Sequence, residues 1–228
     1  SGQEKEQFTP CFAVMADGQK VPLRIIFKGT PSIPPRTPGK GKATQPRKNY
    51  FAADILPANR TKNGYPEEGM SFGVEEKSWY DQREYTFLIS DSWKLRPNNG
   101  SIIKQRPCVL VLDDFKCHKG EGFIVDLERK ANTIVICIPG VLTPLLQPLD
   151  RMLIKQMKWP LGGMYTSDSA STKGHLKTGN LKPPGRGVVA KWCKDAWASI
   201  TPETVNTCFK VCAPTLALDG SENRAWCT

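Results

Sequence analysis

Residues 107–118 read PCVLVLDDFKCH, a run of aliphatic side chains that ends on two aspartates. Polar and apolar residues do not alternate in this run, and such a pattern predicts a central β-strand that is covered on both faces. A second apolar run, TIVICIP, occupies residues 133–139, and the residues between the two runs predict a short helix at 120–131. The segment therefore predicts two buried strands and a connecting helix within a mixed α/β layer structure.

The aspartates at the end of the first run have two readings. Asp113 and Asp114 could sit at the tip of a rigid strand to carry out chemistry, or they could cap the helix near residue 120. Asp150, in the motif QPLD, poses the same choice, because the helix dipole favours an acidic side chain in the first turn of a helix. The residues alone leave both readings open.

The rest of the sequence predicts further strands and helices around this segment. An Asp-Gly pair at residues 17–18 joins two β-rich runs within residues 8–29 and predicts a hairpin. Residues 30–66 contain seven prolines and predict a long irregular loop. Further helices are predicted at 79–95, 140–158, 188–200 and 201–213. Pro148 is suited to a helix start, and Thr201 to a helix cap. The predicted order is βββαβαβα followed by helices.

Basic residues are concentrated in two parts of the chain. The net charge is +10, and residues 29–66 carry a local balance of +6 while residues 151–194 carry +8. Such concentration favours a polyanionic partner, because neutralising phosphates releases counterions. Solvated loops are the alternative. The candidate nucleic-acid contacts are Arg36, Lys40, Lys42, Arg47, Lys48, Arg151, Lys155 and Lys158.

The composition disfavours several other classes of protein. No apolar run is long enough to cross a bilayer, and the first eight residues match neither a signal peptide nor a transit segment. The eight cysteines form no CxxC pair, which disfavours a zinc site, and a disulfide framework is not expected in a chain of this size. We therefore expect reduced thiols, a cytosolic or nuclear protein and no membrane partner.

Several motifs resemble one protein family. VLDDFKCH at 111–118, IPGVLTPLLQPLD at 138–150 and AWASITPETVNTCFKVCAPTLALDGSE at 196–222 look like the DDE endonuclease domain of pogo, Tigger and jerky-type transposases, including their domesticated vertebrate copies. ADGQKVPLRIIFKG at 16–29 and EEKSWYDQREY at 75–85 resemble strands and a helix of the same domain. The likeness covers most of the chain, and its closing motif favours the pogo-like branch.

The resemblance implies a ribonuclease-H-like α/β fold, a mixed sheet with flanking helices, in which three carboxylates hold two Mg²⁺ or Mn²⁺ ions. Two metal ions about 3.5–4 Å apart activate a water and stabilise the leaving oxygen in phosphodiester cleavage. Asp113 matches the second acid of the family and Asp150 the third, so both are expected to be catalytic metal ligands. Asp114 is expected to be a neighbour. His118 also matches a family position, although a lone histidine is more often structural.

One strand of the implied fold is missing from this sequence. The family's first strand, which carries its first catalytic aspartate at the centre of the sheet, would precede residue 8, and Glu4, Glu6 and Asp17 are not placed to replace it. We therefore expect no effective cleavage by this chain. The expected organisation is a truncated DDE domain at 1–158 with a basic insertion at 30–66, a low-complexity linker at 159–187 and a helical extension at 188–228.

These expectations combine into a domesticated transposase domain in the nucleus, associated with DNA and chromatin and catalytically inactive as given. An active Mg²⁺-dependent endonuclease, whose first aspartate lies upstream, is the first alternative. A protein-interaction scaffold that presents Trp192, Trp197 and Phe209 from the C-terminal helices is the second. Core packing is the competing role for these three aromatic side chains.

Overall fold

The computed structural model describes residues 7–29, 55, 62, 64–66, 69–78, 82–97, 107–115, 118, 121–171 and 184–212. Its strands are β1 (Phe8–Cys11), β2 (Leu23–Lys28), β3 (Met70–Glu75), β4 (Cys108–Leu112) and β5 (Thr133–Cys137). Its longer helices are α3 (Gln82–Asp91), α4 (Glu121–Ala131), α6 (Ile154–Ser171), α7 (Arg186–Ala198) and α8 (Pro202–Val211). Its short helical segments are η2 (Trp93–Leu95), η4 (Gly140–Leu142), α5 (Thr143–Leu146) and η5 (Leu149–Leu153). The chain is a mixed α/β protein, consistent with the expected ribonuclease-H-like fold class.

The first sheet has the order β1-β2-β3, with an antiparallel β1–β2 pair and a parallel β2–β3 pair. The predicted hairpin between β1 and β2 is confirmed. Gly18 adopts φ +90 at its tip, a conformation that side chains with a Cβ rarely take, and its amide donates to the carbonyl of Met15. The tip lies against α8, because a Cβ built on Gly18 would meet Pro202 at 2.8 Å. The hairpin tip therefore packs closely against the C-terminal helix α8.

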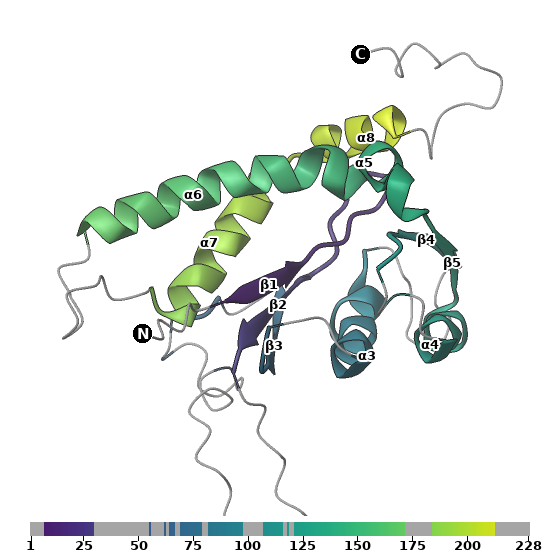
Figure 1. The fold of residues 1–228 in the computed structure, drawn as a ribbon, viewed down its shortest axis with the longest axis horizontal. Coiled ribbons are helices and arrows are strands. Elements are labelled where there is room, and N and C mark those ends of the chain that lie inside the picture. The colour runs from purple at the N-terminus through teal and green to yellow at the C-terminus, as the bar shows by residue number, and fades with distance from the viewer. Residues whose placement is uncertain are drawn as a thin grey trace, which may run out of the picture.

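The second sheet consists of β4 and β5, which run parallel with Cys108 opposite Thr133. Helix α4 connects the two strands, as the sequence predicts. Among the described residues, β4 pairs with β5 alone and β1 pairs with β2 alone, so the two sheets are not joined by a ladder. Figure 1 shows β1–β3 and β4–β5 as separate sheets.

Each sheet has its own hydrophobic cluster. The first joins β2, α6, α7 and α8, with Ile25, Met157 and Cys193 fully buried. The second joins α3, η2 and α4 to one face of β4–β5, with Phe123 and Leu127 at its centre. In Figure 1, α6 and α7 accompany the first sheet and α3 and α4 lie on the other side of the molecule. The two clusters are the layers that a mixed α/β fold needs to cover its strands.

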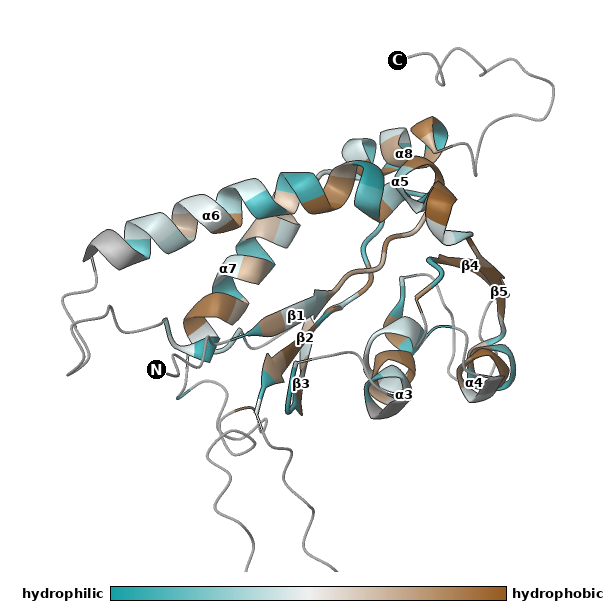
Figure 2. Cartoon of the chain, in the orientation of Figure 1, coloured by the Kyte–Doolittle hydropathy of each residue, from teal (hydrophilic) through white to brown (hydrophobic). Residues whose placement is uncertain are grey.

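The prediction that β4 and β5 are covered on both faces is wrong. Val109, Ile134 and Ile136 are 54%, 62% and 51% exposed. The neighbouring residues Leu110 and Val135 pack against the second cluster, so one face of the pair is covered and the other is open. Figure 2 shows β4 and β5 as strongly hydrophobic strands. An uninterrupted apolar run indicates that both faces of a strand are apolar. It does not indicate whether other parts of the same chain pack against both faces.

The prediction that the helix after Asp150 ends near residue 158, and that a linker begins at 159, is also wrong. Helix α6 runs on to Ser171 with Pro160 inside it. Leu153 and Met157 are fully buried, and Leu161 packs against the same cluster. Their spacing of four residues places all three on one face, so tertiary packing carries the helix past a proline that would otherwise disfavour it. The remaining part of the expected linker lies outside the described residues.

A buried arginine and a partly buried lysine connect different parts of the fold. Arg24 of β2 forms an ion pair with Glu84 of α3 at 2.8 Å, and the two side chains are only 2% and 5% exposed. Gly73 of β3 makes room for this pair, since a Cβ there would lie 2.5 Å from a Glu84 oxygen. Lys20 donates its Nζ to the carbonyls of Trp197 and Ile200 at 2.7 and 2.8 Å. A lysine that binds the last carbonyls of α7 stabilises its C-terminus.

None of the helices in the described part combines the length and the apolarity needed to span a bilayer. The described cysteines, Cys11, Cys108, Cys137, Cys193, Cys208 and Cys212, are free thiols.

Candidate carboxylate site and adjoining cavity

Asp113 stands directly after β4, at the carboxyl end of the strand. Its Oδ1 lies 2.6 Å from Nδ1 of His118 and accepts a longer hydrogen bond, at 3.4 Å, from the backbone amide of Phe115. These contacts stay within the loop between β4 and α4. Asp113 therefore organises a strand-end loop.

His118 supports Asp113 from the side. The imidazole is 20% exposed, and its ring lies 5.6 Å from Phe115 and 6.1 Å from Phe123 between centroids. Phe123 belongs to the buried second cluster, so His118 is positioned by the core of the protein. The histidine joins that core to the carboxylate at the end of β4.

Asp150 reaches the same region from the helical segments that follow β5. It lies in η5, a π-helical turn that precedes α6, and π-helical turns are frequent at functional sites. Burial raises the pKa of the Asp150 carboxyl, and the negative charge of Asp113 raises it further, while Lys158 acts in the opposite direction. The two aspartates are therefore close enough to repel each other, as two acids of one site should be.

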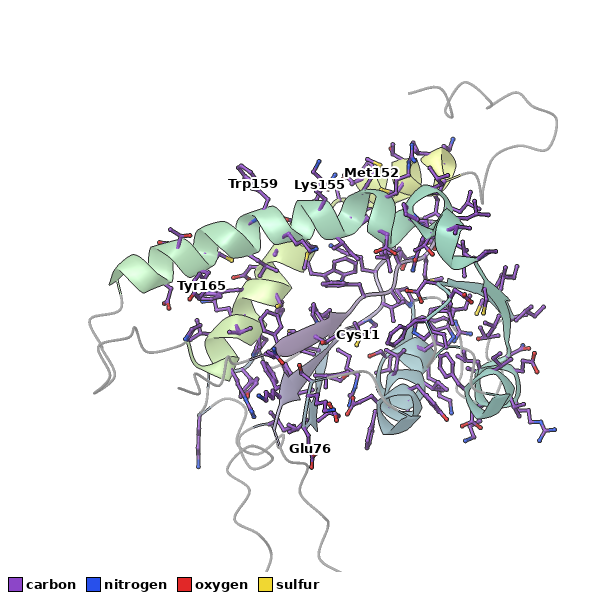
Figure 3. The ribbon with its side chains drawn as sticks, in the orientation of Figure 1. Cys11, Glu76, Met152, Lys155, Trp159 and Tyr165 are labelled. Atoms are coloured by element: carbon purple, nitrogen blue, oxygen red, sulfur yellow. The ribbon has the colours of Figure 1, made fainter. Side chains whose placement is uncertain are left out.

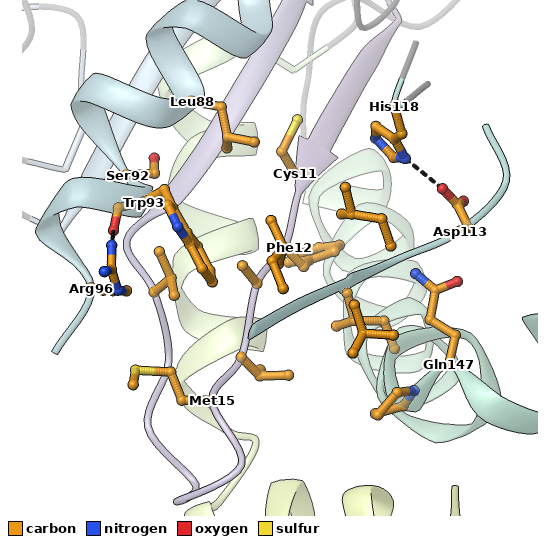
Figure 4. A pocket seen from close by; sticks show the side chains of 18 of the residues that line it. Cys11, Phe12, Met15, Leu88, Ser92, Trp93, Arg96, Asp113, His118 and Gln147 are labelled. Carbon is orange, nitrogen blue, oxygen red and sulfur yellow. Dashed lines mark hydrogen bonds and ion pairs between the residues drawn. The ribbon is translucent and has the colours of Figure 1, made fainter. Parts of the chain in front are cut away.

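Asp113 and Asp150 both face a cavity of about 680 Å³. The cavity extends between residues 9–16 and residues 108–113, and Gln147, Pro148 and Leu149 line it near Asp150. Figure 4 shows Asp113 beside His118, with Gln147 near them and Cys11 and Phe12 further along. This volume is in the range of ordinary ligand sites.

Two of the residues that line the cavity, Gln147 and Cys11, carry notable polar groups. Gln147 is only 9% exposed, and its side-chain oxygen Oε1 is buried without a hydrogen-bond partner among the described residues. A buried amide oxygen without a partner carries a desolvation cost, and it marks a place where a donor is expected. Burial raises the pKa of the Cys11 thiol to about 12, so this group is neutral at physiological pH. The cavity wall is thus largely apolar, and Asp113 and Asp150 are its acidic members.

A divalent metal fits this site in ligand type but not in ligand number. Carboxylate oxygens are the donors that Mg²⁺ prefers. The described residues, however, contain no group of three or more His, Cys, Asp or Glu side chains arranged to hold a metal ion. Asp113 and Asp150 are two carboxylates, and Asp113 already contacts His118. The described residues therefore do not by themselves provide a complete two-metal site.

The basic residues of the second stretch lie beside the acids. Arg151 is in η5, and Lys155 and Lys158 follow in α6, both exposed. Lys158 is close enough to lower the pKa of Asp150. Trp159, which is 86% exposed, comes next on the same helix. Figure 3 shows Lys155 and Trp159 on the outer side of α6.

The candidate contacts of the first basic stretch, Arg36, Lys40, Lys42, Arg47 and Lys48, lie outside the described residues.

Three site residues escaped the sequence reasoning. Gln147 belongs to the motif QPLD that contains Asp150, and its position in this motif, directly before Pro148, is the feature of the sequence that could have pointed to it. Cys11 carried no signal, because a thiol in an apolar strand looks like a small core residue. Trp159 lay in a segment expected to be a linker, where an exposed tryptophan after a lysine does not indicate a site.

Comparison with known proteins assigns residues 5–209 to the family described as DDE superfamily endonuclease. Two curated relatives are each called "Pogo transposable element with KRAB domain". The protein from Mus musculus is 28% identical and the protein from Homo sapiens 29% identical over 226 residues, or 99% of this chain. The chain spans 32% of the length of each relative. No solved structure matches the chain.

Proposed function

Because the chain belongs to the DDE superfamily endonuclease family, we propose that it is a pogo-type, transposase-derived domain that works in the nucleus, associates with DNA and chromatin, and does not cleave DNA by itself. The observation that carries the proposal is the meeting of Asp113 and Asp150 at one cavity, next to the cations of η5 and α6. Two acids of a cleavage site persist there, and a phosphate-binding surface adjoins them.

The charge next to the acids supports the nucleic-acid association. Arg151, Lys155 and Lys158 form one basic surface at the start of α6, and the whole chain carries a net charge of +10. Lysine and arginine side chains bind phosphates and release counterions, which gives affinity without sequence preference. Phosphates held here would run past the Asp113–Asp150 end of the cavity.

The number of carboxylates supports the inactivity. Two-metal cleavage needs ligands that fix both ions about 3.5–4 Å apart, and Asp113 with Asp150 supply only two carboxylates for that task. Mg²⁺ retains several waters when few protein ligands are offered, so two acids would place neither ion firmly. The chain is therefore expected to bind DNA without hydrolysing it.

A salt titration tests the nucleic-acid proposal. Binding of a short fluorescein-labelled DNA duplex is measured by anisotropy over a range of salt concentrations. Each lost phosphate contact lowers the slope of log K against log salt by about 1, so Lys155→Ala with Lys158→Ala should reduce it by about 2. Lys130→Ala, which removes an exposed cation of α4 next to Asp126, is the matched control and should leave the slope unchanged. Equal slopes for all three proteins would contradict the proposal. A fluorescent fusion in cultured cells tests the nuclear location.

An active endonuclease is the second candidate, and the repulsion between the two acids favours it. A pair in which one carboxylate raises the pKa of the other is stabilised when a cation binds between them. In this version a third aspartate comes from sequence upstream of Ser1. A plasmid-nicking assay with Mg²⁺ on a longer chain, with Asp113→Ala and Asp150→Ala as controls, decides the matter. Nicking that both substitutions abolish would establish this candidate, and nicking that neither affects would exclude both aspartates from catalysis.

The packing of the three aromatic side chains disfavours the protein-interaction scaffold, because they do not form an exposed aromatic surface. Trp197 is 7% exposed, its ring lies 4.9 Å from that of Phe12, and Lys20 Nζ lies 5.6 Å from its centroid. Trp192 and Phe209 also pack against the first cluster. Core packing therefore accounts for Trp197, and it accounts for the sides of the partly buried Trp192 and Phe209 that contact the cluster.

A further inference from the structure

Trp159 differs from the other tryptophans that the structure describes. Trp93, Trp192 and Trp197 each pack against one of the two hydrophobic clusters, whereas Trp159 is 86% exposed on α6. Figure 3 shows its side chain on the outer side of the helix, where Lys155 also lies. Trp159 therefore contributes little to the packing of α6, and its aromatic surface is open to a ligand.

The helix leaves the indole of Trp159 uncovered. Side chains of an α-helix lean toward its N-terminus, so the residues three and four positions later are the ones that would cover this ring. Those residues are Gly162 and Gly163, and a Cβ built on either meets nothing within 4 Å. Thr166, one turn further along, donates its hydroxyl back to the carbonyl of Gly162 at 2.9 Å. Glycine is disfavoured inside a helix relative to alanine, so the open surface beside Trp159 lowers the stability of α6.

The charges around Trp159 favour an anionic ligand. Arg151, Lys155 and Lys158 precede it in η5 and α6, and residues 151–167 contain no acidic side chain. Lys155 lies one helical turn before Trp159, about 6 Å along the axis. A partner surface made of apolar groups alone would desolvate these cations without pairing them. An exposed aromatic ring beside a row of cations is the combination with which proteins bind the bases and the phosphates of a single strand.

We propose that Trp159 is a stacking platform for an unpaired DNA base, which makes the basic surface of α6 a binding site for single-stranded DNA. This rests on the proposed function, because Arg151, Lys155 and Lys158 supply the phosphate contacts. The bases of a duplex are already stacked on one another, so an indole finds a free base face on an unpaired nucleotide. Stacking of this kind tolerates any sequence, because every base has a π-face.

Anisotropy with fluorescein-labelled DNA of about 12 nucleotides tests the stacking. The probes are a single strand of mixed sequence, the same strand in a duplex, and an abasic strand that keeps the sugars and phosphates. Trp159→Leu should weaken binding of the single strand about 5- to 150-fold, the effect of losing one stacked base. Its affinity for the duplex and for the abasic strand should stay within about twofold of the parent chain's, because the phosphate contacts remain. Trp159→Phe, which keeps an aromatic face, should retain most of the affinity for the single strand.

A glycine substitution tests the open face of the indole without changing the ring or the charges. Gly163→Leu adds a side chain beside Trp159, in open space. It should weaken binding of the single strand at least about fivefold and leave duplex binding unchanged. The thermal midpoint should not fall, because leucine is a better helix former than glycine. Gly185→Leu, which also adds a side chain in open space but at the start of α7, is the matched control and should bind the single strand as the parent chain does.

The possible failures separate this proposal from the proposed function. Equal binding of the single strand by the parent chain and Trp159→Leu would overturn the stacking and leave the nucleic-acid association standing. The same would follow if Trp159→Leu lost duplex binding to the same extent, or if the parent chain bound the abasic strand as tightly as the normal one. If the parent chain bound none of the probes, the proposed function would fail as well. An RNA strand of the same sequence that bound at least about tenfold more tightly than the DNA strand would identify RNA as the ligand and would overturn the assignment to DNA.

Discussion

Replacing Glu84 by glutamine should destabilise the protein strongly. The Arg24–Glu84 pair is almost completely buried, with contacts of 2.8 and 2.9 Å, and it connects β2 to α3. Removing one partner of such a pair leaves an uncompensated buried charge, which costs about 3–5 kcal/mol. Arg24 keeps its hydrogen bond to Ser71 at 3.1 Å, so we expect the lower end, about 3 kcal/mol.

Urea unfolding followed by circular dichroism measures this loss. With a slope of about 2–3 kcal/mol per M for a chain of this size, the midpoint should fall by about 1–1.5 M. Asp126→Asn is the matched control, because it breaks an exposed pair between Asp126 and Lys130 at a similar distance of 2.9 Å. An exposed i,i+4 pair contributes about 0.3–0.5 kcal/mol, so this midpoint should barely move.

A double variant isolates the cause. Arg24→Gln combined with Glu84→Gln removes both charges and should be more stable than Glu84→Gln alone, because no unpaired ion remains in the core. The reasoning would be refuted if Glu84→Gln and Asp126→Asn had the same midpoint. It would also fail if the second substitution added its own full penalty.

Four further predictions rest on named contacts. The pKa of Asp150 measured by NMR should lie above that of an ordinary aspartate. In Asp113→Asn this pKa should fall but stay above the ordinary value, because burial is the larger cause of the shift. An unchanged pKa in that variant would refute the interaction between the two aspartates. Since the folded state holds that proton more tightly, the contribution of Asp150 to stability should decline as pH rises from the ordinary aspartate pKa through the raised one, and Asp150→Asn should flatten that part of the pH profile of unfolding. Gly18→Ala should cost more than Gly64→Ala by about 1–3 kcal/mol in urea unfolding, because both glycines have positive φ but only Gly18 abuts α8; equal losses would refute the contact. Lys20→Met should lower the free energy of unfolding by about 1–3 kcal/mol, since the last carbonyls of α7 lose a charged donor, and an unchanged thermal midpoint would argue against this capping.

Local signals in the sequence predicted the elements well. The Asp-Gly pair produced the hairpin, with Gly18 at φ +90. Thr201 caps α8 by accepting from the amide of Thr204, as expected from a threonine followed by proline. The helix predicted at 79–95 is found as α3 and η2, and Tyr85, Ile89 and Trp93 from these segments are buried in one cluster. Each of these features depends on a few neighbouring residues, so the sequence contains most of the information.

Features that depend on distant partners were not predictable in the same way. Nothing near Arg24 in the sequence indicates that Glu84, sixty positions later, neutralises it. The exposure of Val109 depends on which strand occupies the neighbouring position in the sheet, and its aliphatic context is the same in either case. The continuation of α6 through Pro160 depends on the packing of Leu161 against the core, which is visible only in three dimensions. Long-range packing decided all three outcomes.

The candidate site was predictable in its members and not in its environment. The resemblance identified Asp113 and Asp150, and the structure brings both to one cavity. The partnership of Asp113 with His118 and the unsatisfied oxygen of Gln147 depend on loop geometry that side-chain identity does not specify.

The π-helical turn around Asp150 makes the site sensitive to insertions and deletions. Such a turn accommodates one residue more than the helix that follows it, and each residue of an α-helix rotates its neighbour by about 100° around the axis. Loss of one of the other residues of Leu149–Leu153 would therefore rotate the Asp150 carboxylate away from Asp113, although both aspartates would remain in the sequence. Among diverged copies of this domain, the spacing after the proline of QPLD should then be a better guide to a surviving acid pair than the presence of the aspartates themselves.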